Sequence, residues 1–344
     1  MKLKAFVMCA GLGTRLRPLT LDTPKPMMKI SNKPLLVNTL DILKQADIKG
    51  IVINLHSHPE IIENYFKDGS DFGVKIKYSF EKKLMGTAGG LSNVKSHFMD
   101  GTFVVMSGDG LVDIDLKEAV KFHKSKNALA TIVLKRYDSK LKYGFVFADA
   151  KTAKIKKFVE KPELKDIYEN RVNTGIYIFE PEIFKYIPEN KFYDFGTNVF
   201  ADLMQKKLAV YAYEMDGYWC DIGDLDAYKM AQKDVLDGKL NFSKSFKSSG
   251  NSCSNVEIET RTVVGENNKF GENVEIKKYS VLGNNCKLNK NVKIENSIVG
   301  DNVEIGENSH LVDCIVMDNS VVGKNQFVNN GIFTRQLSSA LERR

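Results

Sequence analysis

Aliphatic and aromatic residues recur at every sixth position in the C-terminal part of the chain. The repeated positions are Val264, Phe270, Ile276, Leu282, Leu288, Ile294, Val299, Ile305, Leu311 and Val322, with one slip of a residue before Val299 and another before Val322. A helix shows a period of about 3.6 and a half-buried strand a period of two, so neither produces this pattern. Repeats of six predict a left-handed parallel β-helix, in which each unit forms one side of a triangular coil, here over about three turns.

The longer N-terminal part alternates short apolar strands with amphipathic helices. The expected elements are residues 5–9, 34–46, 50–55, 59–66, 74–79, 86–94, 103–107, 115–124 and 130–134. This alternation predicts a doubly wound, Rossmann-like α/β sheet, whose ligands bind at the carboxyl ends of the strands.

Strands expected at 144–148, 155–160, 175–179 and 208–214 indicate an antiparallel or mixed extension of that sheet. A helix is expected at 224–237, with Asp224 as its N-cap and Gly238 at its end. The serine-rich stretch that follows has the composition of a linker. We therefore expect a catalytic domain at residues 1–240, a linker at 241–254, and the β-helix with a C-terminal tail at 255–344.

The composition excludes several classes of protein. A hydrophobic content of 43% and a charged content of 27% are ordinary for a globular protein, and the apolar runs are too short to span a bilayer. The net charge of +7 is scattered over many lysines, without the basic stripe and stacking aromatics of a nucleic-acid binder. The start, Met1-Lys2-Leu3-Lys4, leads into a strand without a secretory signal, so a cytoplasmic protein is expected.

The five cysteines have no Cys-x-x-Cys spacing, and their number is odd. We expect neither a disulfide framework nor a zinc site, and interpret them as buried small residues.

A glycine-containing loop, Ala10-Gly11-Leu12-Gly13-Thr14-Arg15, follows the first strand, and Pro24-Lys25-Pro26 follows soon after. Glycines allow backbone amides to approach an anion, and Arg15 and Lys25 add positive charge, so the loop predicts a triphosphate site. Leu16 stands where a dinucleotide fingerprint has its third glycine, and no Gly-Lys-Ser/Thr follows Gly13, which argues against both a Rossmann dehydrogenase and a P-loop.

Two carboxylates stand at turns where a metal ion could be held. Asp109 follows the apolar strand 103–107, and Asp221 lies in Trp219-Cys220-Asp221. Each alone is an ordinary turn residue, but as a pair beside a triphosphate loop they are the oxygen ligands that Mg²⁺ requires.

Together with Gly86-Thr87-Ala88-Gly89, Glu160-Lys161-Pro162 and Val172-Asn173-Thr174-Gly175, these motifs resemble the sugar-1-phosphate nucleotidylyltransferases, or nucleotide-sugar pyrophosphorylases. The resemblance covers roughly residues 3–240 and is strongest to the guanylyltransferase branch that acts on mannose 1-phosphate. It implies that the chain joins GTP and mannose 1-phosphate into GDP-mannose and pyrophosphate. The alternatives are a glucose-1-phosphate uridylyl-, thymidylyl- or adenylyltransferase, and a non-catalytic nucleotide-sugar sensor that regulates a partner.

The resemblance also implies roles for individual residues. The catalytic residues would be Arg15, Lys25 and Lys161. The nucleotide would be bound by Ala10, Gly11, Gly13, Thr14, Arg15, Lys25, Gly86 and Thr87. The sugar phosphate would be bound by Asp109, Gly144, Glu160, Lys161 and Asn173. The cofactor Mg²⁺ would be held by Asp109 and Asp221, and a homo-oligomer is expected because β-helices and these enzymes tend to self-associate.

Overall fold

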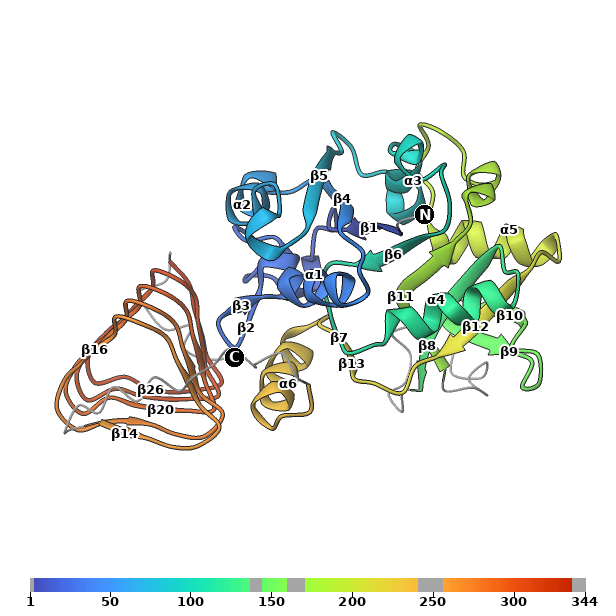
Figure 1. The fold of residues 1–344 in the computed structure, drawn as a ribbon. Helices are drawn as coiled ribbons and strands as arrows, with labels where there is room; N and C mark the ends of the chain where they lie inside the picture. Colours follow the sequence, from blue (N-terminus) through green and yellow to red (C-terminus); the bar gives the residue numbers. More distant parts are fainter. Residues whose placement is uncertain (1–2, 137–143, 160–170, 241–255, 336–344) are drawn as a thin grey trace. The chain divides into compact units, whose positions relative to one another are not determined.

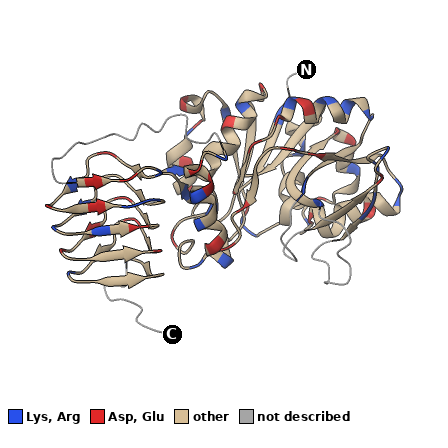
Figure 2. Cartoon of the chain, turned by 90° about the horizontal axis from the view of Figure 1, so that it is seen from below, with Lys and Arg blue, Asp and Glu red and all other residues tan. Residues whose placement is uncertain are grey.

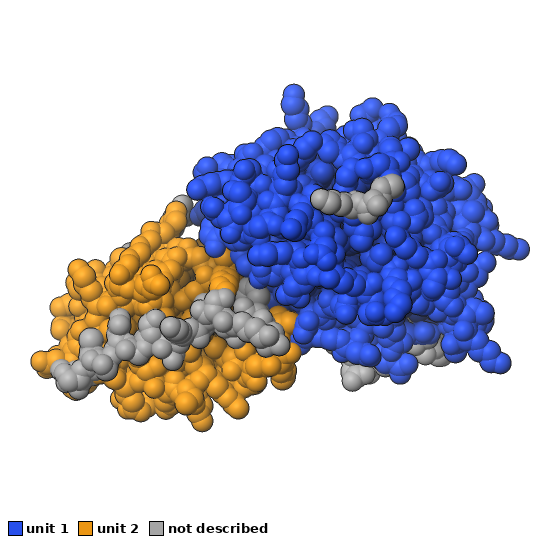
Figure 3. Space-filling model, in the orientation of Figure 1, with its two compact units in different colours: residues 1–14, 22–27, 35–221 blue, residues 15–21, 28–34, 222–344 orange. Residues whose placement is uncertain are grey.

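The computed structural model describes residues 3–136, 144–159, 171–240 and 256–335. The chain divides into two compact units, one formed by residues 1–14, 22–27 and 35–221 and the other by residues 15–21, 28–34 and 222–344 (Figure 3). Each unit is described in turn. Lys and Arg are interspersed with Asp and Glu along the chain (Figure 2).

The first unit is built on a nine-stranded mixed sheet (Figure 1). Its parallel part has the order β5, β4, β1, β6, comprising Lys75–Phe80, Gly50–Leu55, Lys4–Met8 and Phe103–Ser107. Strand β11 (Arg171–Phe179) pairs antiparallel with β6 and with β8 (Ala130–Arg136), and β12 (Val210–Glu214) pairs parallel with β8. A hairpin of β9 (Phe145–Ala148) and β10 (Ile155–Val159) completes the sheet.

Both faces of this sheet are covered, because alternate residues of a strand point to opposite sides. Ala5 and Val7 of β1 pack in one core with α1 (Leu35–Gln45), α2 (Pro59–Phe66) and α4 (Leu116–Ser125). Phe6 packs in the other core with α3 (Gly86–Ser92) and α5 (Phe200–Gln205), which follows the π-helix Phe195–Val199. The predicted doubly wound sheet with a mixed extension is confirmed.

A separate two-stranded ribbon lies beside the carboxyl end of β6. Strand β7 (Gly110–Val112) pairs antiparallel with β13 (Trp219–Asp221), so that Gly110 faces Asp221. The side chain of Asn38 on α1 binds the backbone of this ribbon at Val112. It accepts from Val112 N at 2.9 Å and donates to Val112 O at 3.0 Å. The ribbon thereby joins two segments that are far apart in the sequence.

The second unit contains the β-helix, a hairpin and helix α6 (Leu225–Leu236), whose N-cap Asp224 accepts from Ala227 N as predicted. The hairpin is formed by β2 (Lys29–Ile30) and β3 (Lys33–Pro34). Its turn residues Ser31 and Asn32 have φ of 46° and 65°, the pair of positive values typical of a tight two-residue hairpin.

The β-helix consists of three parallel sheets with a triangular cross-section (Figure 1). The first sheet contains Val256–Ile258, Val274–Ile276, Lys293–Glu295, His310–Val312 and Phe327–Asn329 (β14, β17, β20, β23, β26). The second contains Val263–Val264, Val281–Leu282, Ile298–Val299, Ile315–Val316 and Ile332–Phe333 (β15, β18, β21, β24, β27). The third contains Lys269–Phe270, Lys287–Leu288, Glu304–Ile305 and Val321–Val322 (β16, β19, β22, β25).

The predicted repeat positions fall on these strands, and the slips in the period occur where a coil has one residue fewer. Val264 pairs with Leu282, eighteen residues on, whereas Leu282 pairs with Val299, seventeen residues on. The β-helix is longer than the three turns expected, because sheets of five and four strands require more than four coils. At the corners, asparagines with positive φ form hydrogen-bonded ladders, as in Asn273–Asn291–Asn308, since asparagine tolerates this backbone conformation.

Candidate active site

Three charged side chains of the first unit form one cluster. Lys25 Nζ lies 2.8 Å from Asp109 Oδ2 and 3.0 Å from Asp221 Oδ1. Lys25 is buried, with a side chain 8% exposed, whereas the Asp109 and Asp221 side chains are 28% and 24% exposed. A buried cation thus lies between two carboxylates that reach the surface, so an anionic ligand can approach the group from outside.

The fold explains how residues almost two hundred positions apart meet. Asp109 follows β6 at the carboxyl edge of the sheet, and the pairing of β7 with β13 brings Asp221 beside it. Trp219 fixes the second strand of this ribbon by donating its indole N–H to Thr174 O at 3.2 Å. Lys25 is contributed by the short turn Lys25–Met27, in which Met27 N donates to Pro24 O at 2.8 Å.

Mutual charge stabilises the ionised forms of this cluster. Burial alone would raise the pKa of Asp109, but the charge and hydrogen bond of Lys25, with a hydrogen bond from Ser107, hold it below its ordinary value. Burial likewise opposes the charge of Lys25, yet Asp109 and Asp221 raise the pKa of its ammonium above its ordinary value. Lys25 is therefore a fixed cation at neutral pH.

The two carboxylates fit the requirements of a hard divalent cation. Both bring oxygens within 3.0 Å of one nitrogen, so a cation can be held between them. No group of three or more His, Cys, Asp or Glu suited to a metal occurs among the residues the structure describes. A site with two carboxylates suits Mg²⁺, which usually keeps several waters and takes further ligands from substrate phosphates.

Residues at and just after the carboxyl ends of β1, β4 and β5 line a cavity of about 190 Å³. Its walls are Met8, Ala10, Gly11, Asn54, Glu81, Leu84, Gly86, Thr87, Phe192 and Asp194. Because β5, β4, β1 and β6 are neighbours in that order, Glu81, Asn54, the Gly11 loop and Asp109 follow one another along the same edge of the sheet. Four predicted nucleotide-binding residues, Ala10, Gly11, Gly86 and Thr87, meet in this cavity.

Glu81 was not predicted from the sequence. It is 5% exposed, and its two carboxylate oxygens accept from Asn54 Nδ2 at 2.7 Å and from Met85 N at 3.0 Å. Asn54 in turn accepts from Cys9 N at 2.8 Å, which ties the pair to the start of the glycine loop. A Cβ on Gly90 would lie 2.3 Å from Glu81 Oε1, so only glycine leaves room for this arrangement. The only sequence signal was an acidic residue directly after a strand.

Thr87 is held at the rim of the same cavity by Asp194. Its N–H and its hydroxyl both donate to Asp194 Oδ1, at 2.9 and 3.0 Å. The Thr87 hydroxyl also accepts from Phe195 N at 2.9 Å, which links α3 to the π-helix. The start of α3 is therefore fixed before any ligand binds.

The remaining predicted residues fall into three groups. Asn173 N donates to Gly144 O at 2.9 Å, and Asn173 Nδ2 donates to Tyr177 OH at 2.9 Å, so these two sugar-site residues are adjacent. Gly13 has a φ of 60°, and Thr14 begins the short 3-10 helix Thr14–Leu16, where Arg15 is exposed and belongs to the second unit. Glu160 and Lys161 lie outside the described residues.

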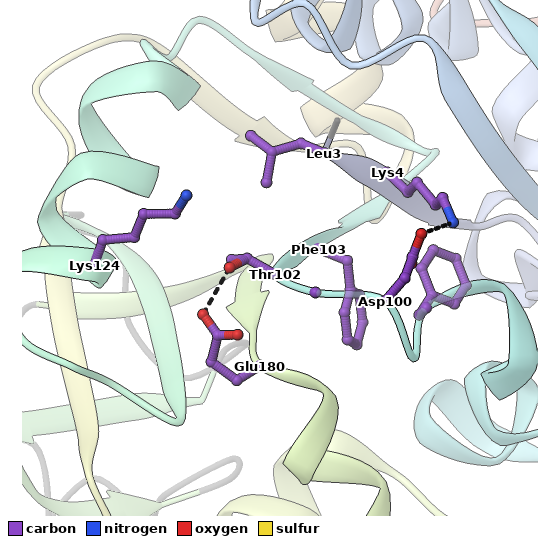
Figure 4. Close-up of a pocket in the computed structure, with 9 residues that line it drawn as sticks. Leu3, Lys4, Asp100, Thr102, Phe103, Lys124 and Glu180 are labelled. Atoms are coloured by element: carbon purple, nitrogen blue, oxygen red, sulfur yellow. Dashed lines mark hydrogen bonds and ion pairs between the residues drawn. The ribbon is translucent and has the colours of Figure 1, made fainter. Parts of the chain in front are cut away.

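A second cavity of about 220 Å³ lies at the opposite edge of the sheet, by the first residues of β1 and β6 (Figure 4). In its wall, Lys4 pairs with Asp100 at 2.6 Å, and Thr102 donates to Glu180 at 2.7 Å. It lies away from the carboxyl ends of the parallel strands, where ligands of such sheets bind.

Cys9, Cys220, Cys286 and Cys314 are buried, as predicted for these four. In the described part of the chain, no helix has the length and apolar character needed to cross a bilayer.

Comparison with known proteins identifies the family of each part of the chain. The profile of the nucleotidyl transferase family matches residues 4–238, and that of the EIF2B subunit epsilon LbH domain, a left-handed β-helix, matches residues 244–336. A UTP–glucose-1-phosphate uridylyltransferase of Synechocystis is 43% identical over 251 residues, 69% of this chain and 64% of that relative. The alignment thus spans slightly less than two thirds of that relative's length.

Mannose-1-phosphate guanylyltransferase 1 of Arabidopsis thaliana is 33% identical over 272 residues, 77% of this chain and 73% of that relative. A crystal structure from Bacillus anthracis, of a protein assigned as a glucose-1-phosphate thymidylyltransferase and bound to sucrose, superposes with a TM-score of 0.62 at 26% identity. The superposition covers 70% of this chain and 97% of the Bacillus anthracis chain.

The fold and the family match define a nucleotidyl transferase followed by a left-handed β-helix. Within that class, the chain belongs to the sugar-1-phosphate nucleotidylyltransferase family.

Proposed function

We propose that the chain transfers a nucleotidyl group from a nucleoside triphosphate to a sugar 1-phosphate, with GTP and mannose 1-phosphate as its preferred pair. The reaction class is supported by the cluster of Lys25, Asp109 and Asp221 at the carboxyl edge of the sheet, together with the family match. The single observation that carries the choice of base is the buried carboxylate of Glu81.

The reaction is an in-line displacement. An oxygen of the sugar phosphate attacks the α-phosphorus, a new P–O bond forms, and the bond between the α- and β-phosphates breaks to release pyrophosphate. The sugar phosphate is already ionised at neutral pH, so no general base is needed. Charge grows on the α-phosphate oxygens and on the leaving group, where fixed cations lower the barrier.

The residues of the cluster have complementary roles in this proposal. The Lys25 ammonium, fixed by two carboxylates, would neutralise charge on the triphosphate, and Arg15 would add a second cation. Asp109 and Asp221 would hold Mg²⁺, which supplies Lewis-acid stabilisation of the phosphates when bound. Gly144, Glu160 and Asn173 would bind the sugar, and Lys161 its phosphate.

Glu81 favours guanine because of its hydrogen-bonding chemistry. A carboxylate only accepts hydrogen bonds, and each of its oxygens has capacity for more than the one bond it makes here. Guanine presents two neighbouring donors, N1–H and the 2-amino group, which match a carboxylate. Uracil and thymine present a single N–H between two carbonyl acceptors, which suits an amide side chain better.

One comparison favours a second candidate. The relative named as a uridylyltransferase of glucose 1-phosphate shares 43% identity, more than the 33% shared with the Arabidopsis guanylyltransferase. The candidate is therefore UTP with glucose 1-phosphate, on the same site and by the same displacement.

The test is pyrophosphate release with Mg²⁺ over a grid of GTP, UTP, dTTP, ATP and CTP against mannose 1-phosphate and glucose 1-phosphate. A dominant signal with GTP and mannose 1-phosphate supports the proposal. If another pair dominates, that pair replaces GTP and mannose 1-phosphate as the proposed substrates, and the proposed reaction class is unchanged. Absence of release in every combination contradicts the reaction class and favours the nucleotide-sugar sensor.

A further inference from the structure

Lys29 forms two ion pairs within the second unit. Its Nζ lies 2.6 Å from Asp301 Oδ2 and 2.9 Å from Asp318 Oδ2, and its side chain is 29% exposed. The two aspartates come from successive coils of the β-helix. The hairpin of β2 and β3 is thus attached to the β-helix by the Lys29 ammonium, which lies between the two aspartate carboxylates.

The two aspartates are oriented before they meet the lysine. Asp318 Oδ1 accepts from Asp301 N at 2.8 Å, and Asp301 Oδ1 accepts from Asn284 N at 2.8 Å. Each carboxylate therefore uses one oxygen on the backbone of the preceding coil and the other on Lys29. Such pre-orientation reduces the conformational entropy lost in forming the ion pairs.

The backbone of the hairpin is fixed as well. Lys29 O accepts from Tyr228 OH and from Gln232 Nε2, both at 2.8 Å, and Ser31 N donates to Gln232 Oε1 at 2.8 Å. Gln232 is 1% exposed, and Asn32 Nδ2 donates to Leu282 O at 2.8 Å. Both α6 and the β-helix therefore hold this segment.

The hairpin lies between two segments that build the active site. It follows the Lys25–Met27 turn with only Met28 between them, and Leu35 of α1, the helix that carries Asn38, comes directly after it. Lys25 and Lys29 are four residues apart in the chain. Only Pro26, Met27 and Met28 separate them, so a shift of Lys29 would act on the turn that presents Lys25 through a short backbone link.

We propose that Lys29, held by Asp301 and Asp318 of the β-helix, is a positioning residue that sets the placement of Lys25 for triphosphate binding and transfer. The inference rests on the proposed function in assigning Lys25 to the triphosphate. It gives the β-helix a role in the reaction without contributing any group that touches substrate. A displacement of about 1 Å in a phosphate-binding cation is enough to cost up to about 100-fold in rate.

The test compares Lys29→Met and Lys29→Arg with Lys287→Met. The last variant is the matched control, because Lys287, on β19 of the third sheet, forms a similar inter-coil ion pair, with Glu304 at 2.7 Å, and this pair involves no residue of the hairpin. Steady-state pyrophosphate release gives kcat and KM for each substrate. Comparison of each variant's thermal unfolding curve with that of the wild type identifies the variants that remain folded.

We expect Lys29→Met to lower kcat/KM for the triphosphate about 10-fold or more while KM for the sugar phosphate changes less than about twofold. Lys29→Arg restores most of the activity and Lys287→Met leaves it unchanged. The double variant Asp301→Asn, Asp318→Asn reproduces Lys29→Met, and adding Lys29→Met to it causes little further loss. A folded Lys29→Met enzyme with wild-type kinetics overturns the inference.

Amide hydrogen exchange separates this inference from the proposed function, because it needs no turnover. Residues 24–28 should exchange faster in Lys29→Met than in wild type or in Lys287→Met, because the hydrogen bond from Met27 N to Pro24 O loses its support. Unchanged exchange in this segment refutes the positioning role even if the wild-type chain has no activity. If the wild-type chain has no activity but residues 24–28 still exchange faster in Lys29→Met, the coupling of Lys29 to Lys25 is supported. Only the proposed function is then rejected.

Discussion

Replacement of Lys25 by Met removes the cation that lies between two carboxylates and nearly preserves the length of the side chain. In the wild type, Asp109 and Asp221 each lie within 3.0 Å of the Lys25 nitrogen, so their nearest oxygens are at most about 6 Å apart. At an effective dielectric constant of about 20, two unit charges at that distance repel by about 3 kcal/mol.

Partial exposure of the two carboxylates reduces that figure. Breaking a fully buried pair costs about 3–5 kcal/mol, but these side chains are 28% and 24% exposed. We therefore expect Lys25→Met to lower the free energy of unfolding by about 2 kcal/mol, and to lower kcat by about 100- to 1000-fold through loss of a transition-state cation. Urea unfolding and pyrophosphate release measure the two effects, with exposed Lys49→Met as the control.

The pH dependence of this variant gives a sharper check. The charge and hydrogen bond of Lys25 lower the pKa of Asp109 against the effect of burial, so without Lys25 that pKa is higher than in the wild type. Folded Asp109 then takes up a proton at a higher pH in the variant than in the wild type, so the stability deficit of the variant relative to wild type should shrink as the pH falls from 7 to 5. Millimolar Mg²⁺ should also stabilise it more than the wild type, because the ion can replace the lost ammonium between the two carboxylates. A variant with wild-type stability, indifferent to pH and Mg²⁺, refutes the reasoning.

Three further predictions test separate parts of the molecule. Glu81→Gln should move the preference from GTP toward UTP by about 10-fold or more in the ratio of kcat/KM, measured in competition, since an amide matches uracil better; an unchanged ratio removes Glu81 from base selection. Burial lowers the pKa of His123, so wild-type stability should fall between pH 6.5 and 5 as the unfolded chain takes up the proton, and urea unfolding of His123→Gln should show a shallower fall. Gly300→Ala should destabilise the β-helix by about 1–3 kcal/mol in thermal unfolding, because its Cβ would lie 2.2 Å from Asp318 Oδ1; an unchanged melting temperature would show that the coils can separate freely.

Local pattern was enough to predict most of the secondary structure. Helix α2 has the predicted bounds, and β4 and β6 also agree residue for residue, because period and turn residues are local signals. The repeat positions in the β-helix were equally clear. The number of coils was underestimated because strands at both ends of the β-helix, such as Val256–Ile258 and Phe327–Asn329, are more exposed and interrupt the apolar period.

The candidate site was only partly accessible from the sequence. Asp109 and Asp221 were paired as turn carboxylates near the triphosphate loop, yet the position of Lys25 between them depends on the β7–β13 ribbon, which has no local signature. Glu81 was missed because an isolated acidic residue after a strand has no period or spacing to mark it. The hairpin at residues 28–34 was missed for a related reason, since its contacts are with α6 and the β-helix, about two hundred or more residues further along the chain.

We expect Lys25, Asp109 and Asp221 to form the reacting centre. The most direct measurement is the turnover of Asp109→Asn in the pyrophosphate assay, at saturating Mg²⁺ and with the best substrate pair of the wild type. We expect kcat to fall at least about 100-fold while the far-ultraviolet circular dichroism spectrum stays that of the wild type. Near-normal turnover of the folded variant would contradict the assignment of this cluster.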